Sequence, residues 1–205
     1  MDNKHLLVID FEATCSEDDY VARTEMEIIE LGAVMVEAGS QAFVDEFQSF
    51  VRPIRKPRLT EFCTELTSIQ QSEVDAAPSF AEMMIAFAGW LSRFDDAVFC
   101  SWGDYDCRQL HQDCDYHSVP YPFDNRHINL KAEFAKQRRT RKMGLTTALD
   151  AVGLPLVGTH HRGIDDARNI ARLIPFIYPK SAGTLGSPRS TGDTGDVKGP
   201  DARPS

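Results

Sequence analysis

The sequence predicts an α/β fold, with a mixed central sheet flanked by helices, in a domain that covers residues 1–180. Two observations carry this prediction. The chain has 205 residues, of which 42% are hydrophobic and 26% charged, which is typical of a globular domain with a sizeable core. Short apolar runs alternate with segments of helical periodicity, the pattern of an α/β fold with a mixed sheet.

The first half of the chain is expected to contain three strands and then a helix. The apolar run 6–9 is typical of a buried strand, and residues 27–37 form a second one. Residues 42–53 alternate and end at a proline, so we expect a third strand, paired antiparallel with the second. Ser79 is a favourable N-cap for a helix over residues 79–94, where apolar residues recur at helical spacing.

The second half is expected to contribute further strands and helices in turn. Residues 96–102 form a short apolar strand that leads into a helix at 104–114. Residues 126–131 are interpreted as another strand. Helices are expected over residues 144–152 and 161–178.

Residues 181–205 differ in composition from the rest of the chain. They are rich in Gly, Ser, Thr and Pro, contain no aromatic residue, and have only Leu185 and Val197 as sizeable apolar groups. Such a segment buries too little surface to offset the entropy of ordering. We expect a disordered tail after the domain.

Charge and cysteine content narrow the class of protein. A net charge of −9 gives no global positive field for nucleic acid, which argues against a general coat protein but not against an enzyme that binds in a groove. The five cysteines form no CxxC pair, as expected for reduced thiols. No stretch approaches the roughly 18 apolar residues of a membrane span, and the N-terminal run is interpreted as a strand rather than a signal peptide. We therefore expect a cytoplasmic protein without a membrane partner.

Ionisable side chains gather at the ends of three predicted elements. They are Asp10 and Glu12; Asp104 and Asp106; and His160, His161, Asp165 and Asp166. Alternate strand residues face the same side, so the first two carboxylates point to one place. Buried charges need compensation, and an oxygen-rich ligand set suits Mg²⁺ or Mn²⁺ better than zinc. Two such ions about 4 Å apart catalyse in-line displacement at a phosphate.

Three motifs in this order resemble those of a known family. "DFEATC", "SWGDYD" and "HRGIDDARN" are similar to the three motifs of the DnaQ-like DEDDh 3′–5′ exonucleases. "EFCTELTSIQQSEVDAAPSFAEMM" resembles a segment of the branch that contains the Eri-1-type RNA exonucleases and their bacterial relatives. The resemblance covers roughly residues 4–177. It implies a ribonuclease H-like (DnaQ-like) fold, and hence a DEDDh exonuclease domain in residues 1–180.

The resemblance also implies a site with two Mg²⁺ or Mn²⁺ ions. The implied metal ligands are Asp10, Glu12, Asp106 and Asp166. Asp10 would bridge both ions, and Glu12 would act in catalysis by holding the ion on the side of the attacking water. Asp106 fits the second motif because Leu110 follows it by four residues, whereas Asp104 would need a shifted register.

The third motif, H-x-x-x-x-D, fits two pairs of residues. His161 with Asp166 matches it, and so does His160 with Asp165. The family ending "DDA-x-N" selects Asp166, which makes His161 the general base that deprotonates the attacking water. The near-neutral unperturbed pKa of histidine suits that role.

The resemblance implies contacts with the 3′-terminal nucleotide as well. Phe11, Ala13 and Thr14 would approach its sugar, and Leu66 would form a wedge against its base. The family often has glycine where this chain has Ser68.

Two basic stretches lie elsewhere in the chain, at residues 52–58 and 136–142. Either could follow the phosphates of a strand. The alternatives are a charged loop held extended by prolines for the first and a solvated helix face for the second.

The implied activity is release of nucleoside 5′-monophosphates from the 3′ end of single-stranded nucleic acid, with RNA favoured over DNA. One alternative is a regulatory protein that keeps the fold and inhibits a protein partner such as a kinase. Another is a phosphodiesterase for dinucleotides or short oligonucleotides. The presence of four carboxylates and a histidine argues against a purely binding role.

Overall fold

A five-stranded mixed sheet forms the centre of the computed structural model, which describes residues 3–18, 20–124 and 126–180. Its strands are β1 (His5–Ala13), β2 (Ile28–Glu37), β3 (Phe43–Phe50), β4 (Ala97–Ser101) and β5 (His127–Asn129). Their order across the sheet is β3-β2-β1-β4-β5. β1, β2 and β3 pair antiparallel, whereas β4 and β5 continue the sheet parallel to β1. The mixed sheet predicted from the sequence is confirmed, including the antiparallel pairing of the second and third strands.

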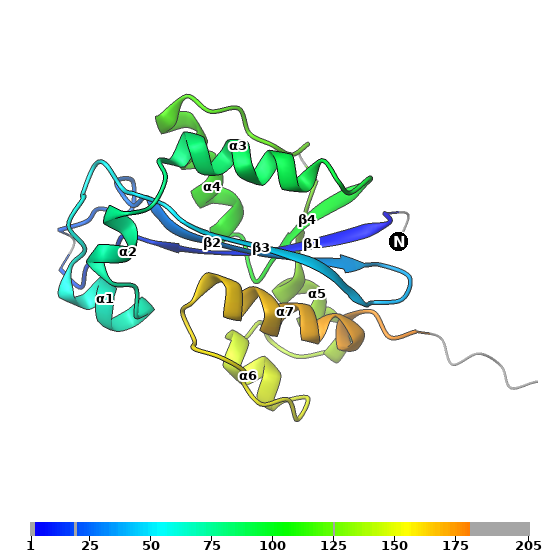
Figure 1. Ribbon diagram of the computed structural model, residues 1–205. Coiled ribbons are helices and arrows are strands. Elements are labelled where there is room, and N and C mark those ends of the chain that lie inside the picture. The colour runs from blue at the N-terminus through cyan, green and yellow to red at the C-terminus, as the bar shows by residue number, and fades with distance from the viewer. Residues whose placement is uncertain (1–2, 19, 125, 181–205) are drawn as a thin grey trace, which may run out of the picture.

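Helices cover both faces of this sheet. They are α1 (Glu61–Thr67), α2 (Gln71–Asp75), α3 (Phe80–Leu91), α4 (Tyr105–His117), α5 (Leu130–Arg138), α6 (Leu145–Asp150) and α7 (Gly163–Ile177). α3 and α4 lie on one face, α5, α6 and α7 lie on the other, and α1 and α2 lie beside one end of the sheet (Figure 1). Within the described residues, no helix is long and apolar enough to cross a membrane.

The alternation of β1 decides where its acidic side chains point. Leu7 and Ile9 belong to the core beneath α3 and α4. Leu6 and Val8 belong to the core beneath α5, α6 and α7. Asp10 continues the second series, and Glu12 follows it, so both point to the face that carries α7.

The beginning of α7 contacts the sheet without intervening side chains. A Cβ atom added at Gly32 of β2 would lie 2.1 Å from the carbonyl carbon of Gly163, and one added at Gly163 would lie 3.0 Å from the carbonyl oxygen of Asp10. Because neither glycine has a Cβ, the first turn of the helix rests directly on β1 and β2. This contact brings the acidic first turn of α7 over the acidic end of β1.

The sequence-based prediction of the elements differs from the structure in several places. Helices α1 and α2 were not predicted, and α5 was anticipated only at its end, by the alternative that residues 136–142 form a helix face; the helix ends at Arg138. The strand expected over 126–131 ends at Asn129, whose side-chain oxygen accepts a hydrogen bond from the Ala132 backbone N–H (2.9 Å) and so begins α5 instead. The helix expected from residue 161 begins at Gly163. The tail expected at 181–205 lies outside the described residues.

Candidate active site

A cavity of about 390 Å³ opens at the end of β1, between that strand, α1, α4 and the loop before α7. The predicted site residues that line it are Asp10, Phe11, Glu12, Ala13, Leu66, Asp106, His161 and Asp166. A larger hollow of about 780 Å³ lies at the opposite end of β1, near Lys4 and Tyr178. The smaller cavity is the site candidate, because the acidic cluster and both neighbouring histidines lie there.

Three carboxylates from two elements meet in this cavity. Asp10 and Glu12 of β1 and Asp166 of α7 each offer an oxygen atom, and these atoms lie within 4.8 Å of one another. Asp106 of α4 lines the same cavity, and its Oδ1 accepts a hydrogen bond from the Phe11 backbone N–H (3.1 Å). That bond ties the start of α4 to the segment of β1 between the other two carboxylates.

The protonation equilibria of these groups reflect their crowding. Burial, followed by repulsion from Asp106 and Glu12, raises the pKa of Asp10 well above its usual range. Burial, followed by repulsion from Asp166, raises the pKa of Glu12 to about 9. Burial raises the pKa of Asp106 to about 6, although the bond from Phe11 opposes the rise. Closely placed buried carboxylates resist joint ionisation in this way unless a cation lies among them.

The donor set fits hard divalent cations. The described lining of the cavity contains neither lysine nor arginine, and its two histidines lie beside Asp166. Asp10, Glu12 and Asp166 offer closely spaced oxygen atoms, and Asp106 adds a fourth carboxylate to the wall. Oxygen-only ligands of this charge are what Mg²⁺ and Mn²⁺ prefer.

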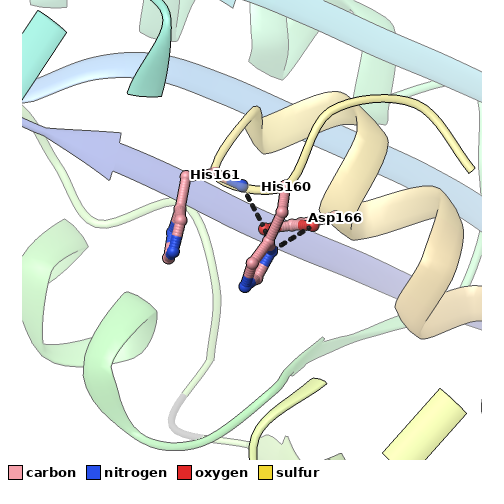
Figure 2. A group of neighbouring side chains, drawn as sticks. All are labelled: His160, His161 and Asp166. Carbon is pink, nitrogen blue, oxygen red and sulfur yellow. Dashed lines mark hydrogen bonds and ion pairs between the residues drawn. The ribbon is translucent and has the colours of Figure 1, made fainter. Parts of the chain in front are cut away.

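Two histidines lie beside Asp166, on the loop that precedes α7 (Figure 2). The Nδ1 atom of His160 is 3.0 Å from Oδ2 of Asp166, and the backbone N–H of His161 donates to the same oxygen (3.0 Å). The two imidazole rings stack, with centroids 3.9 Å apart. Burial and the neighbouring His160 lower the pKa of His161, which favours the neutral imidazole that a general base requires.

The residues of the alternative registers point elsewhere. Asp104 is exposed, and its Oδ1 accepts a hydrogen bond from the side-chain amide of Asn129 (2.8 Å). Asp165 accepts from the Thr159 backbone N–H (2.9 Å) and pairs with Arg168 (3.1 Å). Neither carboxylate lines the cavity.

The residues implied to contact the terminal nucleotide are not all placed alike. Phe11 is almost fully buried in the core beneath α3 and α4, so it presents its backbone to the cavity. Leu66 of α1 is 37% exposed and lines the cavity. Thr14 lies outside this lining, and its hydroxyl accepts a hydrogen bond from the Glu27 backbone N–H (2.9 Å). Ser68, at the end of α1, has a φ of 62°, the left-handed conformation that glycine adopts most easily.

Sequence reasoning missed several residues of this region. Met26, Trp102 and Tyr105 also line the cavity. Trp102 and Tyr105 flank Gly103 and Asp104 within the second motif. Their position in that motif was the signal that could have identified them as site residues. Met26 lies in a loop, and no motif or spacing in the sequence marks it as a site residue.

A buried ion pair behind the cavity was also missed. The Glu30 carboxylate of β2 is fully buried and accepts hydrogen bonds from Arg162 Nε (3.1 Å) and the Gly163 backbone N–H (3.0 Å). Arg162 Nη2 (3.4 Å) and Gln48 of β3 also donate to it. These bonds hold the beginning of α7 on the sheet, and hence Asp166 over β1.

Comparison with known proteins agrees with this geometry. The family model RNase_T, described as an exonuclease, matches residues 7–174. The chain belongs to this exonuclease family. Human ERI1 exoribonuclease 2 is 32% identical over 191 residues, which cover 82% of this chain and 28% of that protein. The probable 3′-5′ exonuclease KapD of Bacillus subtilis is 32% identical over 179 residues, 86% of each chain.

A solved structure extends the likeness to the fold. The nuclease domain of 3′hExo, a DEDDh family member bound to rAMP, superposes with a TM-score of 0.79 at 29% identity, over 85% of this chain and 91% of that one. The DEDDh exonuclease family and the ribonuclease H-like fold that the three motifs implied are confirmed. Exonucleases of this group are metal-dependent. The chain spans only about a quarter of the length of human ERI1 exoribonuclease 2.

Proposed function

We propose that this chain is a metal-dependent 3′–5′ exonuclease domain that releases nucleoside 5′-monophosphates from single-stranded RNA. The observation that carries the proposal is the cluster of Asp10, Glu12 and Asp166, whose oxygen atoms converge in a cavity whose described lining contains no lysine or arginine. A related nuclease domain was solved with rAMP, and another solved structure describes 3′-end specific recognition of a histone mRNA stem-loop by a 3′-exonuclease. These ligands favour RNA over DNA for this chain too.

The proposed cofactors are two Mg²⁺ or Mn²⁺ ions. When bound, such a pair supplies a strong nucleophile at neutral pH and stabilises the leaving oxygen. Asp10, Glu12, Asp106 and Asp166 would hold the ions. In the proposed reaction His161, kept neutral by its lowered pKa, accepts a proton from the attacking water.

Substrate contacts follow from the cavity walls. The backbone of Phe11 and Ala13 would face the sugar of the terminal nucleotide, and Leu66 would pack against its base. The five cysteines are free thiols, which fits a reducing compartment, and we propose the cytoplasm.

The direct test uses 5′-labelled RNA and DNA of equal sequence, incubated with Mg²⁺, Mn²⁺ or EDTA beside the Asp10→Ala variant. A ladder that shortens from the 3′ end of RNA, and is absent with EDTA and in the variant, is the expected result. Products that appear only from dinucleotides would assign the chain to short-substrate hydrolysis. Intact oligonucleotides in every condition would overturn the proposal.

A further inference from the structure

The two basic stretches of the chain differ in how far their groups already form contacts within the protein. In residues 52–58, the buried Glu27 carboxylate accepts backbone N–H bonds from Ile54 (3.0 Å) and Arg55 (2.5 Å). The guanidinium of Arg55 lies 3.3 Å over the ring of Tyr116, and Lys56 pairs with Glu25 (3.7 Å). Several groups of this stretch are therefore engaged within the protein.

The other stretch, residues 136–142, is exposed along its whole length. It carries five cations, and among the described residues only Lys136 forms an ion pair, with Glu133 at 3.9 Å. Lys136 and Arg138 lie in the last turn of α5, where positive charge complements the helix dipole. That effect does not account for Arg139, Arg141 and Lys142, which follow the helix. Their charges face solvent with no partner in the described part of the chain.

This stretch runs directly into the wall of the candidate active site. Gly144 and Leu145 line the cavity, and so does Trp102, whose indole N–H donates to the Met143 carbonyl (3.1 Å). A second hollow of about 430 Å³ is lined by Met143 together with Arg138, Arg139 and Thr140. The acidic cavity and the basic hollow therefore adjoin at residues 143–145.

We infer that residues 136–142 form the surface that binds the upstream phosphates of the RNA strand whose 3′ end lies in the cavity. The inference rests on the proposed function. A cavity rich in carboxylates repels a polyanion, so a strand needs nearby cations that are not already paired. Of the two basic stretches, only 136–142 combines free cations with continuity to the cavity. This surface therefore contacts the upstream part of long strands and does not contact the terminal nucleotide.

Matched charge removal tests this surface. Arg139→Gln/Arg141→Gln takes two charges from it, and Arg52→Gln/Arg58→Gln takes two exposed charges from the other stretch. Binding of a 5′-labelled RNA of about 20 nucleotides is followed by fluorescence anisotropy over a salt series. The first variant should bind about fivefold to tenfold more weakly, with a salt slope smaller by about 1.4 for two lost phosphate contacts on a single strand. The second variant should bind as the parent does.

Turnover of a trinucleotide in Mg²⁺ separates this inference from a folding defect and from the proposed function. The Arg139→Gln/Arg141→Gln variant should cleave it at the parental rate. Equal losses of RNA binding in both variants, undiminished binding in the first, or an equal loss on the trinucleotide would each overturn the inference. Failure of the parent protein to cleave any RNA would overturn the proposed function, while the binding comparison would still decide the role of this surface.

Discussion

Glu12 and Glu30 occupy facing positions of β1 and β2, but their carboxylates differ in the hydrogen-bond partners that the fold supplies. Both are buried, at 8% and 0% exposure. Glu30 accepts bonds from Arg162, Gly163 and Gln48. The carboxylate of Glu12 has no hydrogen-bond partner within the described residues, and its pKa is raised to about 9.

The contrast separates a structural carboxylate from a functional one. A buried charge is tolerated when its partners come from the fold, as they do for Glu30. When the fold supplies none, the charge must be neutralised by a proton or by an ion from solution. Asp10 and Glu12, for which no side-chain hydrogen bond is found within the described residues, are therefore the carboxylates that lower the stability of the metal-free protein and favour ion binding.

The largest expected effect comes from Asp10→Asn. Because it removes a converging carboxylate of the cluster, RNA turnover should fall about a thousandfold or more. The same change relieves repulsion among buried carboxylates, so the melting temperature of the metal-free protein should rise. Turnover assays and thermal melts with and without Mg²⁺ check both effects. Near-parental turnover would remove Asp10 from the site.

A comparison of the two histidines comes next. His161→Ala should lower turnover on the order of 100-fold by removing the general base, while the Mg²⁺-induced rise in melting temperature stays. His160→Ala removes a side-chain contact with Asp166 and should cost less than tenfold. If His160→Ala lowered turnover more than His161→Ala, the histidine of the third motif would be His160, one residue earlier than assigned.

The partnered carboxylate gives the third prediction. Glu30→Gln leaves Arg162 without its buried counter-charge, so the free energy of unfolding should fall by about 3 kcal/mol, with or without Mg²⁺. Glu12→Gln is its matched control. That variant should stabilise the metal-free protein and weaken the response to Mg²⁺. Denaturant melts of the two variants decide the comparison, which fails if both destabilise the metal-free protein alike.

The sequence predicted the sheet and the cluster because both depend on local patterns. The apolar run of β1 and the i, i+2 spacing placed Asp10 and Glu12 on one side, and the motif register chose Asp106 and Asp166. The structure places all four in one cavity. Their roles as metal ligands stay predictions that the variants above test.

What the sequence did not reveal depends on distant contacts. Glu30 and Arg162 are 132 residues apart in the sequence, so no local pattern predicts that they form a pair. The short helices α1 and α2 carry few apolar positions for a helical period to be visible. Thr14 was expected to contact the substrate, but its hydroxyl accepts a hydrogen bond from the Glu27 backbone N–H, a contact between the residue after β1 and the residue before β2 that spacing alone does not show.

The smallest effect is the pH dependence of the metal-free protein. The pKa of Glu12 rises from 4.5 to about 9 on folding, and that of Asp106 rises from 3.8 to about 6. The folded state therefore binds these protons more tightly than the unfolded state, so stability must fall as pH rises through this window. In EDTA, the melting temperature should decline by several degrees between pH 5 and pH 9, and Glu12→Gln should flatten the decline. Saturating Mg²⁺ should remove it, because bound ions favour the ionised carboxylates. If the decline persisted unchanged in Mg²⁺, these carboxylates would not be the metal ligands. Glu12, unlike Glu30, would then lack a hydrogen-bonding side chain for a reason other than ion binding.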